Sequence, residues 1–219
     1  MSVRPGWVER AQPLLGTLVS IGLCGPGDDD AHALLDAAFA EVAEVHRLMS
    51  FHEAASDVSR LNRSAQAPAS VDPRTVEVLR IALALSAATD GVFDVSIAPQ
   101  LVRAGALPMP RDATAPDPRA NWRDIEILGA DLLIFHRPLW IDLGGIAKGY
   151  AVDRACERIG IGASTRVRVN AGGDLRVAGA YVERVWLRPP AATAATATAT
   201  AMQPLVELSR GSVASRATA

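Results

Sequence analysis

The sequence predicts an α+β fold in which helices flank mostly antiparallel sheets. Two long segments with helical spacing occupy the first half of the chain, and short β-rich segments follow from residue 125 onward. Helices and strands therefore do not alternate as they would in a doubly wound fold. The chain has 219 residues, of which 49% are hydrophobic. This is enough to bury the core of one large domain or of two closely packed halves.

The first elements are predicted to be a strand and a long helix. Residues 13–24 alternate well enough for a strand, and Gly16 marks a bulge or a close approach within it. Three aspartates at 28–30 then offer N-cap and dipole partners to a helix. The apolar residues of this helix recur mostly at steps of three and four: Leu35, Phe39, Val42, Val45, Leu48 and Met49.

A second helix is predicted to begin at Asp72-Pro73, where a capping residue precedes a proline, and to end before Gly91. Neither helical nor strand spacing explains residues 49–62 and 89–99. Both segments mix polar residues with a phenylalanine, and loops of this kind are common at functional sites. Each segment taken alone is equally compatible with a turn that is anchored by its phenylalanine.

The second half of the chain is predicted to be β-rich. Residues 104–118 are rich in proline and alanine and form an irregular connection. The strands expected after it are 125–128, 132–136, 139–142, 166–170 and 175–177. Residues 170–174 hold two glycines between Asn170 and Asp174, which taken alone indicates a hairpin turn. The Ala/Thr repeat at residues 189–202 is predicted to be a low-complexity surface loop.

Lys148 is the only lysine of the sequence, beside 21 arginines. If it is not there by chance, this position requires a compact, flexible ammonium group, which the planar guanidinium of arginine does not replace. Lys148 follows a short apolar run, the pair Gly144-Gly145, and the start of a helix predicted for residues 146–159 and ended by Gly160.

A strand, a glycine turn and a helix N-terminus together form a common anion-binding arrangement, because unpaired N–H groups face the ligand. Phosphate is the expected ligand. The spacing matches neither a Walker A loop nor a dinucleotide-binding fingerprint.

Charge and composition limit the partners. The formal net charge is −2 and the pI is near 6.1, which gives no electrostatic reason to expect nucleic acid or an anionic membrane as the main partner. Cys24 and Cys156 fit no metal or redox spacing and are expected to be thiols. The first residues lack the apolar stretch of a signal peptide, and no apolar run is long enough for a membrane span. The chain is therefore expected to be cytoplasmic.

Five segments, in order, resemble the ApbE-like family of FAD:protein FMN transferases: LLGTLVSI, MSFHEAASDVSRLN, TDGVFDVSIAP, IDLGGIAKGYAVD and VNAGGDLRVAG. The resemblance implies one α+β domain over residues 1–219, built as two associated lobes. It further implies that FAD binds with Mg²⁺. The FMN half of FAD is then transferred to a Thr or Ser hydroxyl of an acceptor flavoprotein, and AMP is released.

The resemblance also assigns roles to individual residues. It implies flavin-nucleotide contacts at Leu15, Ser50, Phe51, His52, Val92, Phe93, Asp94, Asp142, Lys148 and Ser215. It makes Gly145 a metal ligand through its backbone carbonyl. The catalytic candidates are Lys148, Asp142 and His52. The group that deprotonates the acceptor stays open among Asp94, Asp142, Asp174 and His52.

The chain departs from the family pattern at its end. The family continues to a His-(Ile/Leu)-Ile-Asp-Pro-x-Thr-Gly motif whose Asp and Thr complete the metal site, whereas residues 210–219 read RGSVASRATA. The domain is therefore expected to be C-terminally short. This leaves three alternatives to transfer: an FAD-binding protein with impaired catalysis, a metal-dependent hydrolase that converts FAD to FMN and AMP, and a partially folded fragment.

Overall fold

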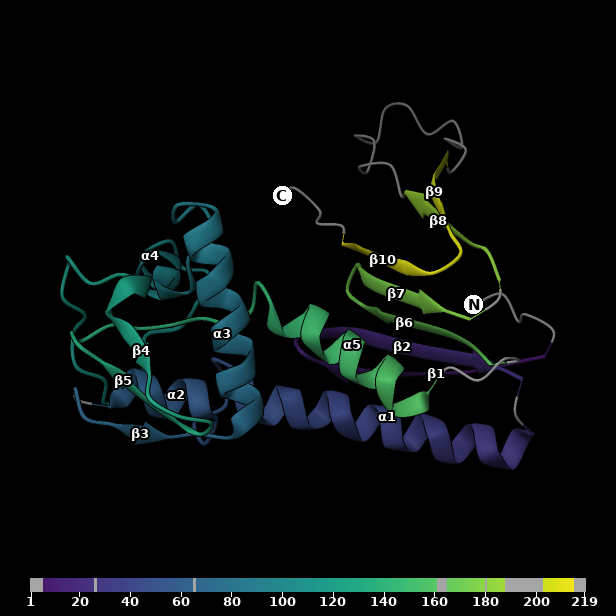
Figure 1. The fold of residues 1–219 in the computed structure, drawn as a ribbon, viewed down its shortest axis with the longest axis horizontal. Helices are drawn as coiled ribbons and strands as arrows, with labels where there is room; N and C mark the ends of the chain where they lie inside the picture. Colours follow the sequence, from purple (N-terminus) through teal and green to yellow (C-terminus); the bar gives the residue numbers. More distant parts are fainter. Residues whose placement is uncertain are drawn as a thin grey trace. The chain divides into compact units, whose positions relative to one another are not determined.

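The computed structural model describes residues 6–25, 27–64, 66–160, 165–179, 181–187 and 203–214. The chain forms two compact units (Figure 1). Unit 1 comprises Met1–Phe39 and Val152–Ala219, and unit 2 comprises Ala40–Ala151. The unit boundaries fall within the helices α1 (Asp28–Met49) and α5 (Ala147–Ile159). Helices and antiparallel sheets occur together, which confirms the predicted α+β class. The Ala/Thr repeat lies outside the described residues.

Unit 1 is built on a five-stranded antiparallel sheet in the order β1-β2-β6-β7-β10. Its strands are β1 (Trp7–Leu14), β2 (Thr17–Cys24), β6 (Arg166–Ala171), β7 (Asp174–Ala178) and β10 (Gly211–Ala214). A two-stranded sheet pairs β8 (Glu183–Leu187) with β9 (Gln203–Leu208). Every second residue of β2 and β6 is fully buried, as expected for a sheet with one covered face: Val19, Ile21, Leu23, Val167, Val169 and Ala171.

Parts of α1 and α5 lie against the five-stranded sheet. Arg10 of β1 pairs with Asp36 of α1 at 2.5 Å, and Arg176 of β7 pairs with Asp153 of α5 at 2.6 Å. The predicted helix at residues 146–159 is confirmed as α5. Gly160 ends it with a φ of +74°, the left-handed conformation that glycine adopts readily at a helix C-terminus.

One prediction for unit 1 is wrong. Residues 13–24 form no single strand, because the chain reverses at Leu15-Gly16 and pairs β1 with β2 along their full length. Leu15 has a φ of +55° and Gly16 a φ of +70°. Positive φ at both central residues is the geometry of a two-residue hairpin turn that matches the twist of the strands. Gly16 therefore marks a turn and not a bulge.

Unit 2 combines helices with a small antiparallel sheet in the order β3-β5-β4. Its elements after α1 are α2 (Asp57–Arg63), β3 (Ala69–Ser70), α3 (Pro73–Ala88), the 3₁₀ turn η1 (Val95–Ile97), α4 (Ala98–Arg103), the 3₁₀ turn η2 (Trp122–Asp124), β4 (Ile125–Ile127) and β5 (Leu132–Phe135). Asp72 caps α3 by accepting a hydrogen bond from the Arg74 N–H at 2.9 Å, as predicted. Residues 104–118 form neither helix nor strand, also as predicted.

One prediction for unit 2 is wrong, and one segment without a predicted element forms a helix. The segment at residues 49–62, for which no regular structure was predicted, contains most of α2, a helix of seven residues that is too short to show a clear period. Ser56 caps it by accepting a hydrogen bond from the Ser59 N–H at 3.0 Å. Residues 139–142 were predicted to be a strand, but they pair with none, although Leu139, Trp140 and Ile141 are buried.

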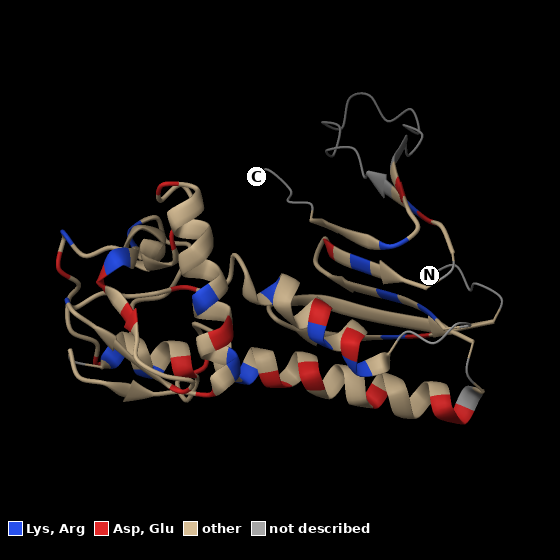
Figure 2. Ribbon diagram, in the orientation of Figure 1, with Lys and Arg blue, Asp and Glu red and all other residues tan. Residues whose placement is uncertain are grey.

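Acidic and basic residues are interspersed over both units (Figure 2). This agrees with the small net charge of the sequence. Cys24 and Cys156 are free thiols, as predicted. Among the helices of the described residues, none has the length and apolar character that a membrane crossing requires.

Candidate functional site

The segment that leads to Lys148 is held in unit 2 by a side chain. Asn62, near the end of α2, donates a hydrogen bond from Nδ2 to the Ile141 carbonyl at 3.0 Å and accepts one at Oδ1 from the Ile141 N–H at 2.7 Å. Asn62 is 4% exposed. Its carboxamide therefore satisfies both polar main-chain groups of Ile141, which a neighbouring strand would otherwise do. Ile141 therefore has partners for both of its main-chain groups without belonging to a strand.

The main chain of Asp142 is held by the 3₁₀ turn η1. The Asp142 N–H donates to the Val95 carbonyl at 2.8 Å. Val95 begins η1, which Asp94 caps by accepting hydrogen bonds at Oδ1 from the Ser96 N–H at 2.8 Å and from the Ser96 hydroxyl at 2.7 Å. The segments 49–62, 89–99 and 141–153 therefore meet at Ile141 and Asp142.

A tight glycine turn follows Asp142. The Gly144 N–H donates to Asp142 Oδ1 at 3.1 Å, and Lys148 Nζ donates to the Gly144 carbonyl at 3.0 Å. A Cβ atom on Gly144 would lie 3.0 Å from Asp142 Oδ2, and one on Gly145 would lie 3.5 Å from Cε2 of Phe93. The absence of a side chain at Gly144 lets the turn fold over the carboxylate. The turn thus brings a carboxylate, an ammonium and the N-terminus of α5 close together.

The carbonyl of Gly145 is available to a ligand. Within the described residues it accepts no hydrogen bond, and Gly145 is exposed. The described part of the chain contains no group of three or more His, Cys, Asp and Glu side chains with metal-binding geometry.

Burial raises the pKa of the Asp142 carboxyl above its ordinary value. The hydrogen bond from the Gly144 N–H, the Lys148 ammonium and the His52 imidazole each act in the opposite direction. Desolvation is the largest of these effects, so the ionised form of Asp142 is disfavoured by its surroundings. Two catalytic candidates, Lys148 and His52, are thus close enough to Asp142 to influence its charge.

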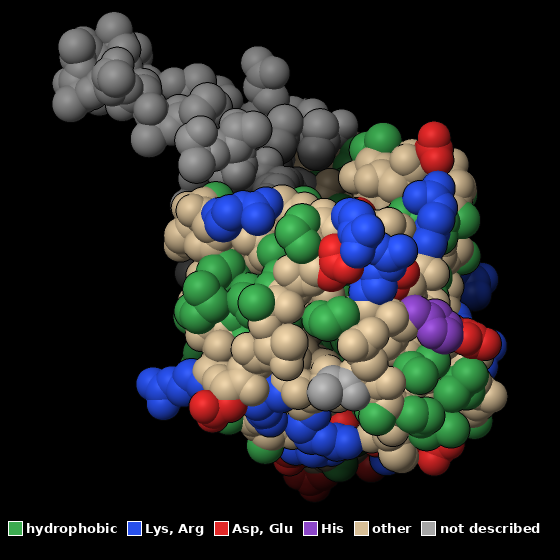
Figure 3. Space-filling model, turned by 90° about the vertical axis from the view of Figure 1, so that its left-hand side faces the viewer, with side chains coloured by type: hydrophobic (Ala, Val, Ile, Leu, Met, Phe, Trp, Pro, Cys, Tyr) green, Lys and Arg blue, Asp and Glu red, His purple; other side chains and the backbone are tan. Residues whose placement is uncertain are grey.

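A cavity of about 380 Å³ opens beside Asn62 within unit 2. Its lining comes from α2 and the residues before it, and from the irregular segment at 108–111: Phe51, His52, Ala54, Ser59, Asn62, Arg63, Pro108, Met109, Pro110 and Arg111. Hydrophobic groups and Arg, Asp and Glu side chains alternate on the face of the molecule seen in Figure 3. Ligand pockets typically combine apolar walls with a few polar groups.

The segment 108–111 is the part of this site that the sequence did not reveal. Its prolines indicated only an irregular connection, and no motif singled out Met109 or Arg111. Met109 is 66% exposed although it is apolar. The one available signal was the placement of a long loop without secondary structure inside a compact unit, because such loops are often functional.

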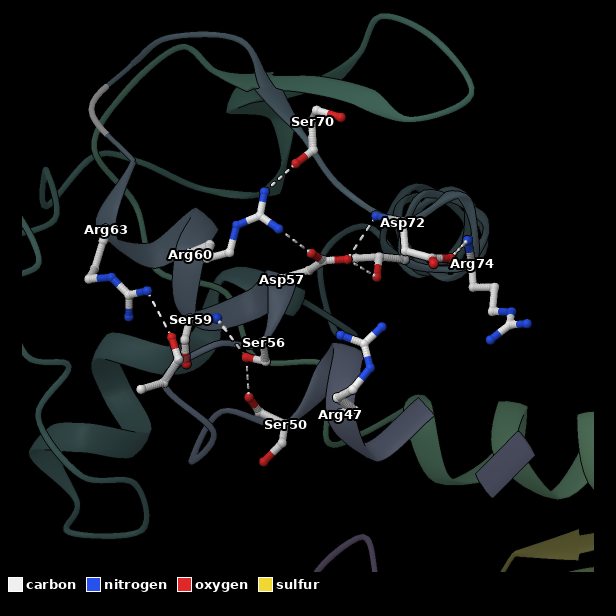
Figure 4. Close-up of polar contacts among 12 residues, drawn as sticks. Arg47, Ser50, Ser56, Asp57, Ser59, Arg60, Arg63, Ser70, Asp72 and Arg74 are labelled. Atoms are coloured by element: carbon white, nitrogen blue, oxygen red, sulfur yellow. Dashed lines mark hydrogen bonds and ion pairs between the residues drawn. The ribbon is translucent and has the colours of Figure 1, made fainter. Parts of the chain in front are cut away.

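Helix α2 is fixed by a network of polar contacts (Figure 4). Asp57 is 3% exposed and accepts hydrogen bonds from Arg60 at 2.9 Å, from the Asp72 N–H at 2.9 Å and from the Thr75 hydroxyl at 2.8 Å. The helix thereby holds a fixed position against the start of α3.

The same helix also fixes the chain before it. The Ser56 hydroxyl donates to the Ser50 carbonyl at 2.6 Å (Figure 4). The Ser59 hydroxyl donates to the Phe51 carbonyl at 3.3 Å. The Ser50 hydroxyl in turn accepts a hydrogen bond from the His52 N–H at 3.2 Å. The positions of Phe51 and His52 on the cavity wall therefore depend on α2.

Nine of the residues assigned by resemblance lie in unit 2: Ser50, Phe51, His52, Val92, Phe93, Asp94, Asp142, Gly145 and Lys148. Val92 is 90% exposed and packs against little. Leu15 and the turn at residues 170–174 belong to unit 1. Ser215 lies outside the described residues.

The two unit 1 segments lie at the same end of the five-stranded sheet. A Cβ atom on Gly172, which has a φ of +62°, would lie 2.6 Å from Thr17 Oγ1. The hairpin between β6 and β7 is confirmed, and the Gly173 N–H donates to Asn170 Oδ1 at 3.0 Å. The turn after Leu15 and the turn after Asn170 are thus direct neighbours.

Comparison with known proteins identifies the family to which this chain belongs. The ApbE family matches residues 15–218, so the chain belongs to the ApbE family. The FAD:protein FMN transferase of Vibrio cholerae is 29% identical over 182 residues, which cover 78% of this chain and 54% of that protein. The FAD:protein FMN transferase of Haemophilus influenzae is 28% identical over 154 residues, which cover 64% of this chain and 44% of that protein. The chain spans about half the length of these relatives.

A solved structure shows the same fold. The crystal structure of the ApbE protein from Thermotoga maritima superposes with a TM-score of 0.76 at 22% identity and covers 94% of this chain and 69% of that protein. The predicted ApbE-like α+β fold is therefore confirmed.

Proposed function

We propose that this chain is an FAD:protein FMN transferase, which moves FMN from FAD to a Thr or Ser hydroxyl of an acceptor flavoprotein and releases AMP. Membership of the ApbE family and the activity for which the relatives are named support the reaction. The observation that carries the proposal is the meeting of three motif segments at Asp142, where Asn62 and the Val95 carbonyl hold the main chain.

In the proposed reaction the acceptor hydroxyl oxygen forms a bond to the phosphorus atom of the FMN half of FAD. The bond between this phosphorus atom and the oxygen of the AMP phosphate breaks, AMP leaves with the electron pair, and the hydroxyl proton passes to a base. Phosphoryl-type transfer depends mostly on positioning and charge neutralisation. The N-terminus of α5 and the Lys148 ammonium would together neutralise the pyrophosphate.

Asp142 is suited to accept the proton. Burial raises its pKa, and an effective base has a pKa closer to the working pH than an exposed carboxylate has. Asp94 is less suited, because its Oδ1 already accepts two hydrogen bonds from Ser96.

The Gly145 carbonyl fits one ligand position of Mg²⁺. Magnesium takes oxygen ligands and is commonly bound by few protein groups together with substrate phosphates and water. When bound, Mg²⁺ would supply charge neutralisation on the phosphate oxygens. The cavity beside Asn62 would hold a ring system of FAD, with Phe51 offering an aromatic surface and Arg63 held in place by its hydrogen bond to the Ala54 carbonyl at 2.8 Å.

The test incubates the purified protein with FAD, Mg²⁺ and a flavoprotein that carries a Thr or Ser flavinylation site, and follows acceptor mass and AMP. We expect the acceptor to gain the mass of FMN, with one AMP released for each. Lys148→Ala should lower the rate by about 10²–10³-fold, because it removes a charge that faces the phosphates. Arg80→Ala is the matched control, since Arg80 is exposed and its side chain donates a hydrogen bond to the Gly129 carbonyl at 3.0 Å, away from the residues of the site.

Two results would replace the proposal. Release of AMP and free FMN with an unmodified acceptor would identify a hydrolase. Saturable FAD binding without AMP release would identify a flavin-binding protein.

A further inference from the structure

Asn62 is a buried polar side chain that the proposed chemistry does not use. Both polar atoms of its carboxamide are directed to a single residue, Ile141, which is 79 positions away in the sequence. It lines the cavity, yet its oxygen and one of its N–H groups are already engaged with the main chain. Asn62 therefore acts on the fold around the site rather than on a ligand.

The chemistry at Ile141 requires an asparagine. A buried N–H and a buried C=O both need partners, and the asparagine side chain offers a donor and an acceptor in one planar group. An aspartate would offer only acceptors when ionised, and a leucine of similar size would offer neither. Because Ile141 is fully buried, water is a poor substitute for the missing partner.

The contact lies directly before the reactive turn. Ile141 is followed by Asp142, whose N–H is held by the Val95 carbonyl, and Asp142 in turn accepts the hydrogen bond of the Gly144 N–H. Two consecutive residues are thus fixed by partners from two different segments. The Asp142 carboxylate and the Gly144 turn extend from this fixed main chain.

Helix α2 gives Asn62 a rigid base. Asp57 ties the start of the helix to the Asp72 N–H and to the Thr75 hydroxyl, and Arg60 donates to the Ser70 carbonyl at 2.5 Å (Figure 4). A side chain anchored in this way can impose its geometry on Ile141 instead of following it.

We infer that Asn62 is a positioning residue that fixes the main chain at Ile141 and thereby orients the Asp142 carboxylate and the Gly144 turn in the FAD site. This inference rests on the proposed function, because the proposed function makes FAD the ligand of this site. Small displacements of a reacting group are costly when catalysis depends on alignment. No other described residue donates or accepts a hydrogen bond at the Ile141 main chain.

The first test needs no FAD. Amide hydrogen exchange is measured for the wild-type protein and for Asn62→Ala. We expect the Ile141 amide to exchange at least about tenfold faster in Asn62→Ala, because a lost buried hydrogen bond corresponds to a factor of this size. Ser86→Ala is the matched control: it removes another buried hydrogen bond of unit 2, the one that the Ser86 hydroxyl donates to the Ala82 carbonyl at 3.0 Å within α3, and should leave the exchange at Ile141 unchanged.

The second test is a double-mutant cycle on FAD affinity. Asn62→Ala should raise the Kd for FAD by at least about tenfold in the wild-type background, but by less than about threefold in the Asp142→Ala background, because positioning has no value once the carboxylate is gone. Ser86→Ala should leave the Kd unchanged in both backgrounds. Equal losses in both backgrounds, or unchanged exchange at Ile141, would overturn the inference.

Asn62→Asp covers the case in which the alanine variant does not fold. The aspartate keeps the shape of the side chain and the acceptor for the Ile141 N–H, and loses the donor to the Ile141 carbonyl. It should raise the Kd for FAD at least about threefold above wild type, because a carboxylate oxygen then faces the Ile141 carbonyl in place of a donor. A Kd equal to wild type would count against the inference. The two proposals fail separately: wild-type protein that binds no FAD contradicts the proposed function, whereas the exchange experiment judges Asn62 without any ligand.

Discussion

The two units stabilise their main chains by different means. In unit 1, five strands pair in continuous antiparallel registers, and β1 and β2 alone align eight residue pairs. In unit 2, the strand β3 has two residues, and the segments that carry the predicted site are held by individual side chains. Asn62 holds Ile141, Ser56 holds Ser50, and Asp57 holds Asp72.

This difference explains why the candidate site is built where it is. A ladder of equivalent hydrogen bonds gives regular structure, and it distributes its stability over many residues. A buried contact from one side chain fixes an irregular segment in one conformation, which a ligand site requires. Unit 2 should therefore be sensitive to single polar substitutions, and unit 1 should be sensitive to changes in shape.

The largest change in the free energy of unfolding is expected for a substitution of Asp57. Asp57→Ala removes the charged acceptor of the Asp72 N–H and of the Thr75 hydroxyl, while the half-exposed Arg60 keeps access to water. At about 1.5–3 kcal/mol for each hydrogen bond to a charged group, the free energy of unfolding should fall by about 3–5 kcal/mol. Urea denaturation measures this loss. The control is Glu207→Ala in unit 1, which breaks an exposed pair with Arg184 and should cost less than about 1 kcal/mol. Similar losses in the free energy of unfolding for Asp57→Ala and Glu207→Ala would contradict the view that unit 2 depends on single buried polar side chains.

The next effect is expected from a change of shape in unit 1. Gly179 has a φ of +103°, and a Cβ atom there would lie 2.2 Å from the Thr165 carbonyl oxygen. Gly179→Ala should therefore cost about 3 kcal/mol, because backbone strain and overpacking add. At Gly160, with a φ of +74°, no atom lies within 4 Å of a Cβ. Gly160→Ala should cost only about 1 kcal/mol. Equal changes in the denaturation midpoint for Gly179→Ala and Gly160→Ala would show that the close contact with the Thr165 carbonyl oxygen does not contribute to the loss of stability.

Substitution of Asp142 is expected to change the free energy of unfolding less, and to raise it instead of lowering it. The pKa of Asp142 is raised by burial, so the folded protein holds this proton more tightly than the unfolded chain. The stability that this group contributes is therefore complete below its unfolded pKa and is lost as the pH rises through the folded pKa. Asp142→Asn does not titrate, so it should be more stable than wild type at neutral pH, while its transfer rate falls.

Urea denaturation from acidic to neutral pH checks this prediction. The stability difference between Asp142→Asn and wild type should shrink toward acidic pH, where both side chains are neutral. A difference that stays constant with pH would contradict the assigned cause of the shift.

The smallest effect concerns the two thiols. Burial raises the pKa of the Cys156 thiol to about 12, so almost none of it is thiolate at neutral pH. Cys24 is partly exposed. A thiol reagent should therefore label Cys24 in the native protein and Cys156 only after denaturation, as read by mass spectrometry of peptides. Rapid native labelling of Cys156 would show that its helix opens readily.

Sequence reasoning worked where a pattern repeats along the chain. The alternation in β6 and β7, the cap at Asp72 and the stop at Gly160 each depend on neighbouring residues, and each was predicted. The segment 139–142 was assigned to a strand because it is apolar, yet its partner is the side chain of Asn62, 79 residues away. No local pattern records such a contact. For the same reason the cavity lining at residues 108–111 became visible only in the fold.

For the site residues too, the local motifs were predictable from the sequence and the long-range contacts were not. The family motifs predicted which segments matter, and the structure brings three of those segments to Ile141 and Asp142. It does not follow from the motifs that Val95 and Asn62 hold the main chain while Asp94 serves as a cap. Those roles depend on hydrogen-bond geometry in unit 2, which spacing along the sequence does not specify.

An FAD site at the turn between Asp142 and Lys148 is best tested by an FAD titration followed by flavin fluorescence, with and without Mg²⁺, for wild type, Lys148→Ala and Arg80→Ala. We expect saturable binding that Mg²⁺ strengthens and an unchanged Kd for Arg80→Ala. For Lys148→Ala we expect a Kd at least about tenfold higher, because a charge-assisted contact is lost. Absence of saturable binding by wild type, or equal affinity of Lys148→Ala, would contradict an FAD site at the turn between Asp142 and Lys148.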